Sequence, residues 1–224
     1  MKKAIPMPIK AILFDLDGTL VDSNELHVAA WEEALARHGH HVDRERIRSQ
    51  IGKGGDTFVP SLLPDLPEDE QEALADAHGE VFQGRFLDRV KPFPGARDLL
   101  QRAHDAGLKV ALASSAAQKE LDHYVGLLDA RDLIDTTTAA DDVETSKPAP
   151  DIVAVALKKL GVVADEALFV GDTPYDVESG AGAGVATVAV LSGGFDREAL
   201  AGAKAVYDDA AALAAAFPDW IASS

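Results

Sequence analysis

Two aspartates, Asp15 and Asp17, follow the short apolar run 11–14 and precede a turn at Gly18 and Thr19. Four apolar residues without helical spacing are typical of a buried strand. Carboxylates at the end of such a strand lose hydration, and a nearby positive charge would offset that cost. Mg²⁺ prefers carboxylate oxygens and often accompanies bound phosphate. The pattern therefore favours a divalent cation here, with an ordinary Asp-Gly turn as the alternative.

Other polar residues with potential chemistry recur farther along the chain, namely Ser114, Ser115, Lys147, Asp172 and Asp176. Each has an ordinary interpretation when it is considered alone. A serine after a strand often caps a helix, a lysine is usually solvated, and an aspartate in a first helical turn interacts with the helix dipole. Only their joint placement would give them a catalytic meaning.

The elements that must position these residues alternate between strand and helix after residue 90. The apolar pattern predicts strands at 109–113, 167–170, 186–191 and 205–207, and helices at 96–106, 118–128, 151–160, 176–183, 196–201 and 208–217. Such alternation predicts a parallel sheet with right-handed crossovers, in which ligands bind at the carboxyl ends of the strands. We therefore expect an α/β, Rossmann-like core in which Asp15, Asp17, Ser114 and Asp172 converge on one crevice.

The segment 24–89 has helical periodicity instead. It predicts a helix that begins after Ser23 and ends near Gly39, followed by helices at 43–51, 57–63 and 68–87. We expect an all-helical cap domain at 23–89, inserted into a catalytic core made of 1–22 and 90–224.

Three residues of this helical insert could approach a substrate. His27 and Trp31 lie four apart on one helix face. His27 is either a hinge residue near the site or a packed histidine, whereas Trp31 is interpreted as packing between helices. Lys53 lies in the glycine-rich loop 52–56 and is either a substrate contact or a surface lysine.

Composition restricts the possible partners. The 224 residues include no cysteine, so disulfides and thiol chemistry are excluded, and 21 basic against 38 acidic residues give a net charge of −17. A negative surface repels nucleic acid and anionic lipid, so we expect neither as a partner. No apolar run could span a membrane, and the first residues lack a signal-peptide pattern. We expect a cytoplasmic protein that is a monomer or a weak homodimer.

The expected cluster suits phosphoryl transfer. Asp15 and Asp172 could hold Mg²⁺, and the Asp15 carboxylate could attack phosphorus to form an aspartyl phosphate. Lys147 could neutralise charge, and Ser114 could donate a hydrogen bond to the transferring oxygens. Asp17 could protonate the leaving oxygen and then take a proton from the attacking water.

With these residues in place, the chain resembles the haloacid dehalogenase-like hydrolase superfamily, in the subfamily with a helical cap after the first strand. Its four motifs match DLDGTLVD at 15–22, Ser114, Lys147 in SKPAPD, and GDTPYD at 171–176. The resemblance implies that Asp15 is the nucleophile and Asp17 the acid/base. It also implies Mg²⁺ bound by Asp15, the backbone carbonyl of Asp17, and Asp172, with Asp176 in support.

The presence of Asp17 reduces the number of superfamily reactions that this chain could catalyse. Dehalogenase and phosphonatase members lack this second aspartate, so both reactions are disfavoured. The chain is similar to β-phosphoglucomutase through His27 and Trp31, but the mutase has a cap arginine for the second phosphate where this chain offers only Lys53.

We therefore expect a Mg²⁺-dependent phosphatase for small phosphorylated metabolites, such as a sugar phosphate or phosphoglycolate. The expected substrate contacts are Thr19, Ser115, Lys53 and His27. A phosphosugar mutase and a catalytically silent phosphate-binding regulatory module remain the alternatives.

Overall fold

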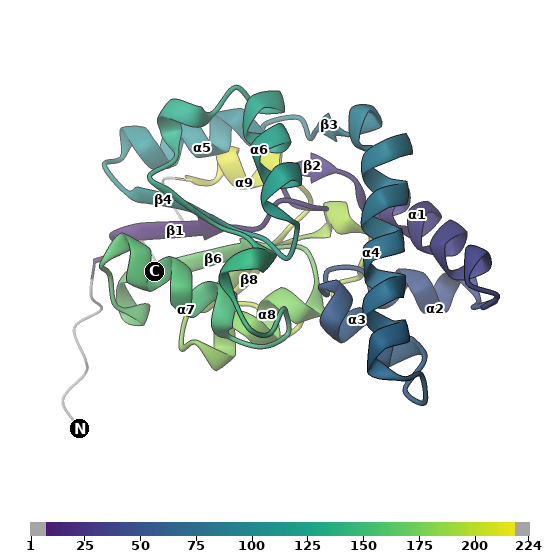
Figure 1. Ribbon diagram of the computed structural model, residues 1–224. Coiled ribbons are helices and arrows are strands. Elements are labelled where there is room, and N and C mark those ends of the chain that lie inside the picture. The colour runs from purple at the N-terminus through teal and green to yellow at the C-terminus, as the bar shows by residue number, and fades with distance from the viewer. Residues whose placement is uncertain (1–7, 218–224) are drawn as a thin grey trace.

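The computed structural model describes residues 8–217 and contains a six-stranded sheet in the order β5-β4-β1-β6-β7-β8, with every neighbouring pair parallel (Figure 1). The strands are β1 (Ala11–Phe14), β4 (Lys109–Ala113), β5 (Thr136–Thr138), β6 (Ala167–Gly171), β7 (Ala186–Val190) and β8 (Ala205–Tyr207). This architecture confirms the predicted α/β, Rossmann-like core. The first seven residues, where we expect no signal peptide, lie outside the described part of the chain.

Alternation along the central strands divides the interior into two layers. Ile12 and Phe14 of β1 pack into one apolar cluster, with α5 (Ala96–Asp105), α6 (Gln118–Leu127) and α9 (Ala210–Ala215). Ala11 and Leu13 face the other cluster, which includes α7 (Asp151–Leu160), and α8 (Pro174–Gly182) lies beside α7 (Figure 1). Because successive side chains of a strand point to opposite faces, a sheet that is apolar on both faces must be covered on both.

The helical insert has an apolar cluster of its own. It comprises α1 (Asn24–Arg37), α2 (Arg44–Arg48), α3 (Gly55–Leu62) and α4 (Glu68–Arg85), which pack around Trp31 and Phe58. A two-stranded antiparallel ribbon, β2 (Val21–Asp22) with β3 (Lys91–Pro92), lies where the chain enters and leaves this insert. This separate packing supports the proposed division into a core and a cap, and we call residues 23–89 the cap.

Short 3₁₀ turns complete the described chain, at Leu87–Arg89, Arg131–Leu133, Ala140–Asp142, Ala164–Glu166 and Leu191–Gly193. The described helices include none with the length and hydropathy of a membrane span.

The predicted helix at 196–201 is wrong, because this stretch forms only turns. The Asp196 carboxylate accepts a hydrogen bond from the Ala199 amide at 2.9 Å, which is a helix-like start. Only Leu200 is buried there, so one apolar anchor must hold the segment, and Gly202 follows at once. One buried side chain is too little packing for a short helix, whose stability comes mainly from its apolar face. The helix predicted at 43–51 is likewise shorter, because α2 ends at Arg48.

The two-layer core makes a direct prediction about stability. Leu13 has no solvent exposure, so Leu13→Ala should lower the free energy of unfolding by about 2–5 kcal/mol through lost burial and a cavity. Val163 is 57% exposed, and Val163→Ala should change it by no more than about 0.5 kcal/mol. Urea denaturation followed by circular dichroism measures both, and equal effects would contradict the assigned layers.

Candidate active site

Main-chain pairing between β1 and β6 continues past the end of β1 to Asp15. The Asp15 amide donates to the Val170 carbonyl at 2.8 Å, so this aspartate is fixed beside the end of β6. The chain then turns through Gly18, which has a φ of +77°. A Cβ at Gly18 would lie 2.2 Å from Asp172 Oδ2, so both the turn and the close approach require glycine.

Three carboxylates lie close together next to this turn. One oxygen each of Asp15, Asp172 and Asp176 lies within 4.8 Å of the others, and all three residues are buried. Lys147, also buried, places Nζ 2.5 Å from Asp15 Oδ1 and 2.8 Å from Asp176 Oδ1. The structure thus brings together four of the residues that the sequence singled out, from three separate segments.

The cluster carries more negative than positive charge. Burial raises the pKa of Asp15 to about 7, although Lys147 opposes this shift. Burial also raises the pKa of Asp172 well above its ordinary value, and the charges of Asp176 and Asp15 add to the effect. Burial alone would lower the pKa of Lys147, but the Asp15 and Asp176 carboxylates outweigh it and raise that pKa. One ammonium group therefore does not balance three carboxylates.

The donor set fits Mg²⁺ because it consists of hard carboxylate oxygens held in place by other groups. Thr19 Oγ1 donates to Asp172 Oδ1 at 2.7 Å, and Asn24 Nδ2 donates to Asp172 Oδ2 at 3.1 Å. A Cβ at Gly193 would lie 1.6 Å from the same Oδ2, so the surrounding backbone leaves space only for glycine. Thr19, predicted as a substrate contact, does not line the cavity described below, and its hydroxyl instead orients Asp172.

Asp176 is positioned by the start of α8. Its Oδ2 accepts hydrogen bonds from the Thr173 amide at 2.9 Å, the Thr173 hydroxyl at 2.7 Å and the Asp172 amide at 3.2 Å. Thr173 also caps the helix, because its side chain accepts from the Asp176 amide. These contacts leave Oδ1 for Lys147 and the carboxylate cluster.

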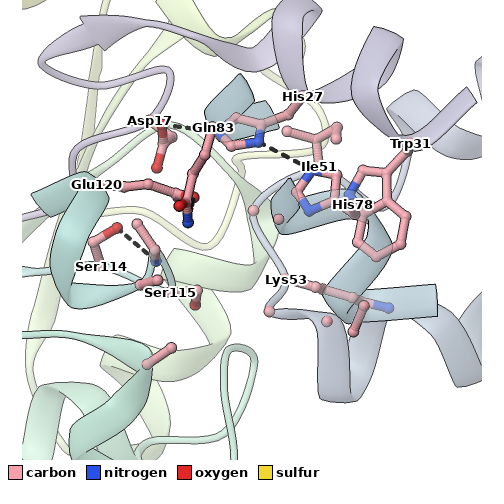
Figure 2. Close-up of a pocket in the computed structure, with 18 of the residues that line it drawn as sticks. Asp17, His27, Trp31, Ile51, Lys53, His78, Gln83, Ser114, Ser115 and Glu120 are labelled. Atoms are coloured by element: carbon pink, nitrogen blue, oxygen red, sulfur yellow. Dashed lines mark hydrogen bonds and ion pairs between the residues drawn. The ribbon is translucent and has the colours of Figure 1, made fainter. Parts of the chain in front are cut away.

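Asp17 points away from that cluster and toward the cap. Its Oδ1 accepts from Ser23 Oγ at 2.5 Å and lies 3.2 Å from His27 Nε2 (Figure 2). Burial would raise the pKa of Asp17, but His27 and Ser23 outweigh burial and lower it, and the same pairing raises the pKa of His27 against the effect of burial. Any contribution of Asp17 to a metal would therefore come from its backbone carbonyl, as the sequence motif implies.

An aromatic stack links this pair to the cap. His27 stacks on Phe82 with ring centroids 3.7 Å apart, and its Nδ1 lies 3.3 Å from His78 Nε2. His78 in turn stacks on Trp31 at 4.0 Å, and Trp31 stacks on Phe58 at 4.0 Å. Trp31 thus packs between cap elements as predicted, and His27 is both packed and adjacent to a candidate catalytic group.

A cavity of about 470 Å³ lies between core and cap, with Asp15 and Asp17 in its wall (Figure 2). Ser114 and Ser115 line its core side. Ser114 Oγ accepts from the Ala116 amide at 3.1 Å, and Ser115 Oγ is buried without a hydrogen-bond partner among the described residues. A buried hydroxyl without a partner is costly unless a ligand or water satisfies it, which makes Ser115 a suitable substrate contact.

Lys53 also lines the cavity, but its amine is directed elsewhere. It donates to Gln50 Oε1 at 2.6 Å and to Ser61 Oγ at 2.8 Å, and it lies 4.6 Å from the centre of the Tyr175 ring. In Figure 2 the Lys53 nitrogen points away from the residues around Asp17. The structure therefore assigns this lysine to contacts within the protein.

Two cap residues that the sequence did not single out hold the segment that carries Lys147. Thr57 Oγ1 donates to the Lys147 carbonyl at 2.8 Å, and Asp56 Oδ2 accepts from the Ser146 amide at 2.9 Å. In the sequence they are marked only by their position at the start of α3, where Asp and Thr commonly cap the helix. The cap thus contacts the backbone that carries Lys147.

Comparison with known proteins agrees with this geometry. The chain matches the family of haloacid dehalogenase-like hydrolases over residues 12–190. The chain belongs to this family.

Its relatives include a putative pyrophosphatase PpaX from Caldanaerobacter subterraneus, 31% identical over 186 residues that cover 82% of each chain. A phosphoglycolate phosphatase from Rhodospirillum rubrum is 31% identical over 227 residues, covering 95% of this chain and 90% of the relative. A crystal structure of a hydrolase from Pseudomonas syringae superposes with a TM-score of 0.88 at 32% identity, covering 95% of this chain and 99% of the other. This haloacid dehalogenase-like protein is therefore a phosphoric monoester hydrolase.

The contact between cap and lysine segment predicts a kinetic effect. Thr57→Val removes the hydrogen bond to the Lys147 carbonyl, and the resulting small displacement of the ammonium should lower kcat about 10-fold. Thr57→Ser keeps a hydroxyl and should retain most of the rate. Steady-state hydrolysis of an aryl phosphate measures both, and equal loss in the two variants would show that the hydroxyl has no positioning role.

Proposed function

We propose that the protein is a Mg²⁺-dependent phosphatase that hydrolyses small phosphate monoesters, of the sugar phosphate or phosphoglycolate type, through an aspartyl phosphate at Asp15. The observation that carries this proposal is the buried grouping of Asp15, Lys147, Asp172 and Asp176, of which Asp15 also lines the cavity between core and cap. The names of relatives, a pyrophosphatase and a phosphoglycolate phosphatase, support small phosphorylated compounds as the substrate class.

The first step begins with Asp15, whose Oδ1 is held by Lys147 while the other oxygen can approach phosphorus. Attack forms the aspartyl phosphate and breaks the bond to the leaving-group oxygen. The ammonium of Lys147 favours the ionised form of Asp15 against the effect of burial and keeps the side chain in place. Ser114 lies where its hydroxyl can contact phosphoryl oxygens. Mg²⁺ bound by Asp15, Asp172 and the Asp17 carbonyl, with Asp176 in support, would offset the negative charge of the phosphoryl group.

Proton transfer falls to Asp17. Its carboxylate lies at the cavity wall next to His27, so the pair can hold a proton for the leaving-group oxygen. Asp17 then takes a proton from the water that attacks the aspartyl phosphate. Inorganic phosphate leaves and the Asp15 carboxylate is restored.

The described cavity weighs against the mutase alternative. A phosphosugar mutase must hold a second phosphate, yet Lys53 is the only lysine or arginine among the described residues that line the cavity, and its amine already has partners. A silent binding module would not need a carboxylate and histidine pair beside the nucleophile. We also propose that the enzyme works in the cytoplasm as a monomer or a weak homodimer, in keeping with its lack of cysteines.

Substitution of the proposed nucleophile tests this function. Asp15→Asn keeps the size of the side chain but removes the attacking oxygen, so aryl phosphate turnover should fall by at least about 10⁴-fold. Turnover by the unaltered protein should also depend on added Mg²⁺ and stop with a chelator.

The control is Asp22→Asn, which changes an exposed carboxylate on β2 outside the cavity and should retain the rate. Undiminished turnover by the Asp15→Asn protein would refute the nucleophile, and absence of turnover by the unaltered protein would favour the regulatory module.

A further inference from the structure

The part of the cavity wall outside the carboxylate cluster has its own chemical character. It is formed by Asp76, Glu80 and Gln83 of cap helix α4 and by the core residues Ser115 and Glu120, of which Figure 2 labels Gln83, Ser115 and Glu120. We call these five residues the leaving-group pocket, because a substrate whose phosphorus lies at Asp15 must place its remaining atoms here. A cavity of about 470 Å³ is within the size range of small-molecule sites.

Glu120 is the most buried acidic group of this pocket, with 5% exposure. It accepts a hydrogen bond from Gln83 Nε2 at 3.2 Å, whereas a carboxylate can accept about four. Gln83 is held in turn, because its Oε1 accepts from Lys119 Nζ at 2.9 Å. Together with the unpartnered hydroxyl of Ser115, the pocket offers several acceptor sites to a ligand with hydroxyl or amine donors.

The positively charged groups near this pocket already have partners. Lys119 donates to Gln83, and His27, whose pKa is raised, is paired with Asp17. Lys53 is engaged with Gln50, Ser61 and the Tyr175 ring, and Lys147 is engaged with Asp15 and Asp176. Neither Asp172 nor Asp176 lines the cavity, so a cation bound among these carboxylates would serve the transferred phosphoryl group. An anionic leaving group would therefore face Asp76, Glu80 and Glu120 without a counter-charge.

We propose that the enzyme selects phosphate monoesters whose leaving group is an uncharged or amine-bearing polyhydroxy compound, and that it rejects leaving groups carrying a second anionic group. This inference rests on the proposed phosphatase function and narrows it. Of the two substrate types proposed above, it favours the sugar phosphate and excludes phosphoglycolate, whose leaving group carries a carboxylate. Selection by repulsion is effective because an anion placed next to the buried Glu120 loses part of its hydration and gains no compensating partner.

Two matched substrate pairs test the selection in the unaltered enzyme. Glucose 6-phosphate should have a kcat/KM at least about 30-fold above that of 6-phosphogluconate, which adds one carboxylate. Phosphoethanolamine should likewise exceed phosphoglycolate, which replaces an amine by a carboxylate at the same chain length. Equal values within a pair, or a preference for the anionic member, would overturn the proposal.

Variants assign the selection to the pocket. Asp76→Asn/Glu120→Gln removes two carboxylates with little change in shape, and it should reduce the discrimination within each pair at least about fivefold. Glu70→Gln/Glu72→Gln removes two exposed carboxylates on α4 outside the cavity and serves as the matched control. Unchanged discrimination in the first variant, or an equal change in both, would contradict the assignment.

A binding measurement separates this inference from the proposed function. Asp15→Asn protein with Mg²⁺ should bind glucose 6-phosphate at least about 30-fold more tightly than 6-phosphogluconate in isothermal titration calorimetry. If the unaltered enzyme hydrolyses an aryl phosphate but this affinity ratio is absent, the selection fails while the phosphatase stands. If no ester is hydrolysed but the ratio is present, the phosphatase fails while the selection stands.

Discussion

The ion pairs of the Lys147 ammonium with Asp15 and Asp176 are the interaction on which the rest of the site depends. Taking these charges out of water is costly, and removing one partner of such a buried pair usually costs about 3–5 kcal/mol. The ammonium compensates only part of the charge of the three carboxylates, so a cation bound there would lower the electrostatic cost of the cluster. Because of this charge imbalance, the residues at the carboxyl ends of the strands are suited to contact a cation.

Hydrogen bonds from the cap reach two residues of the site, Lys147 and Asp17. The cap residue Thr57 holds the carbonyl of Lys147, and the cap residue His27 holds the carboxylate of Asp17. Gln83 reaches from α4 to Glu120 of the core. The contacts that hold the cap on the core therefore also hold Lys147 and Asp17, the residues proposed to act in catalysis. A cap held in this way would help to exclude water from a reactive intermediate.

The sequence predicts β1, β4, β6, β7 and β8 because these strands are apolar runs that end abruptly. It misses β5, whose three threonines form no apolar run. The strand 109–113 and the helix 151–160 have the predicted bounds, and Gly18 occupies a turn that requires glycine. The helix predicted at 196–201 fails because local pattern there is not supported by packing. The two-residue ribbon β2–β3 is too short to have a periodicity.

The sequence does not indicate which supporting residues contact each other across distant segments. Thr19 carries no mark of its bond to Asp172, 153 positions away, and Lys53 carries none of its engagement by Gln50 and Ser61. The acidic leaving-group pocket is likewise formed only when α4 lies against α6. Motif residues were found because several chemical types had to meet, whereas supporting residues have types that fit any surface.

Chemical trapping of the intermediate tests the central claim most directly. The enzyme is mixed with substrate and Mg²⁺, quenched in acid within one turnover, reduced with borohydride and analysed by peptide mass spectrometry. An aspartyl phosphate is reduced to homoserine, so the account predicts homoserine at position 15. Turnover that leaves Asp15 unreduced, with homoserine at another aspartate position, would contradict it.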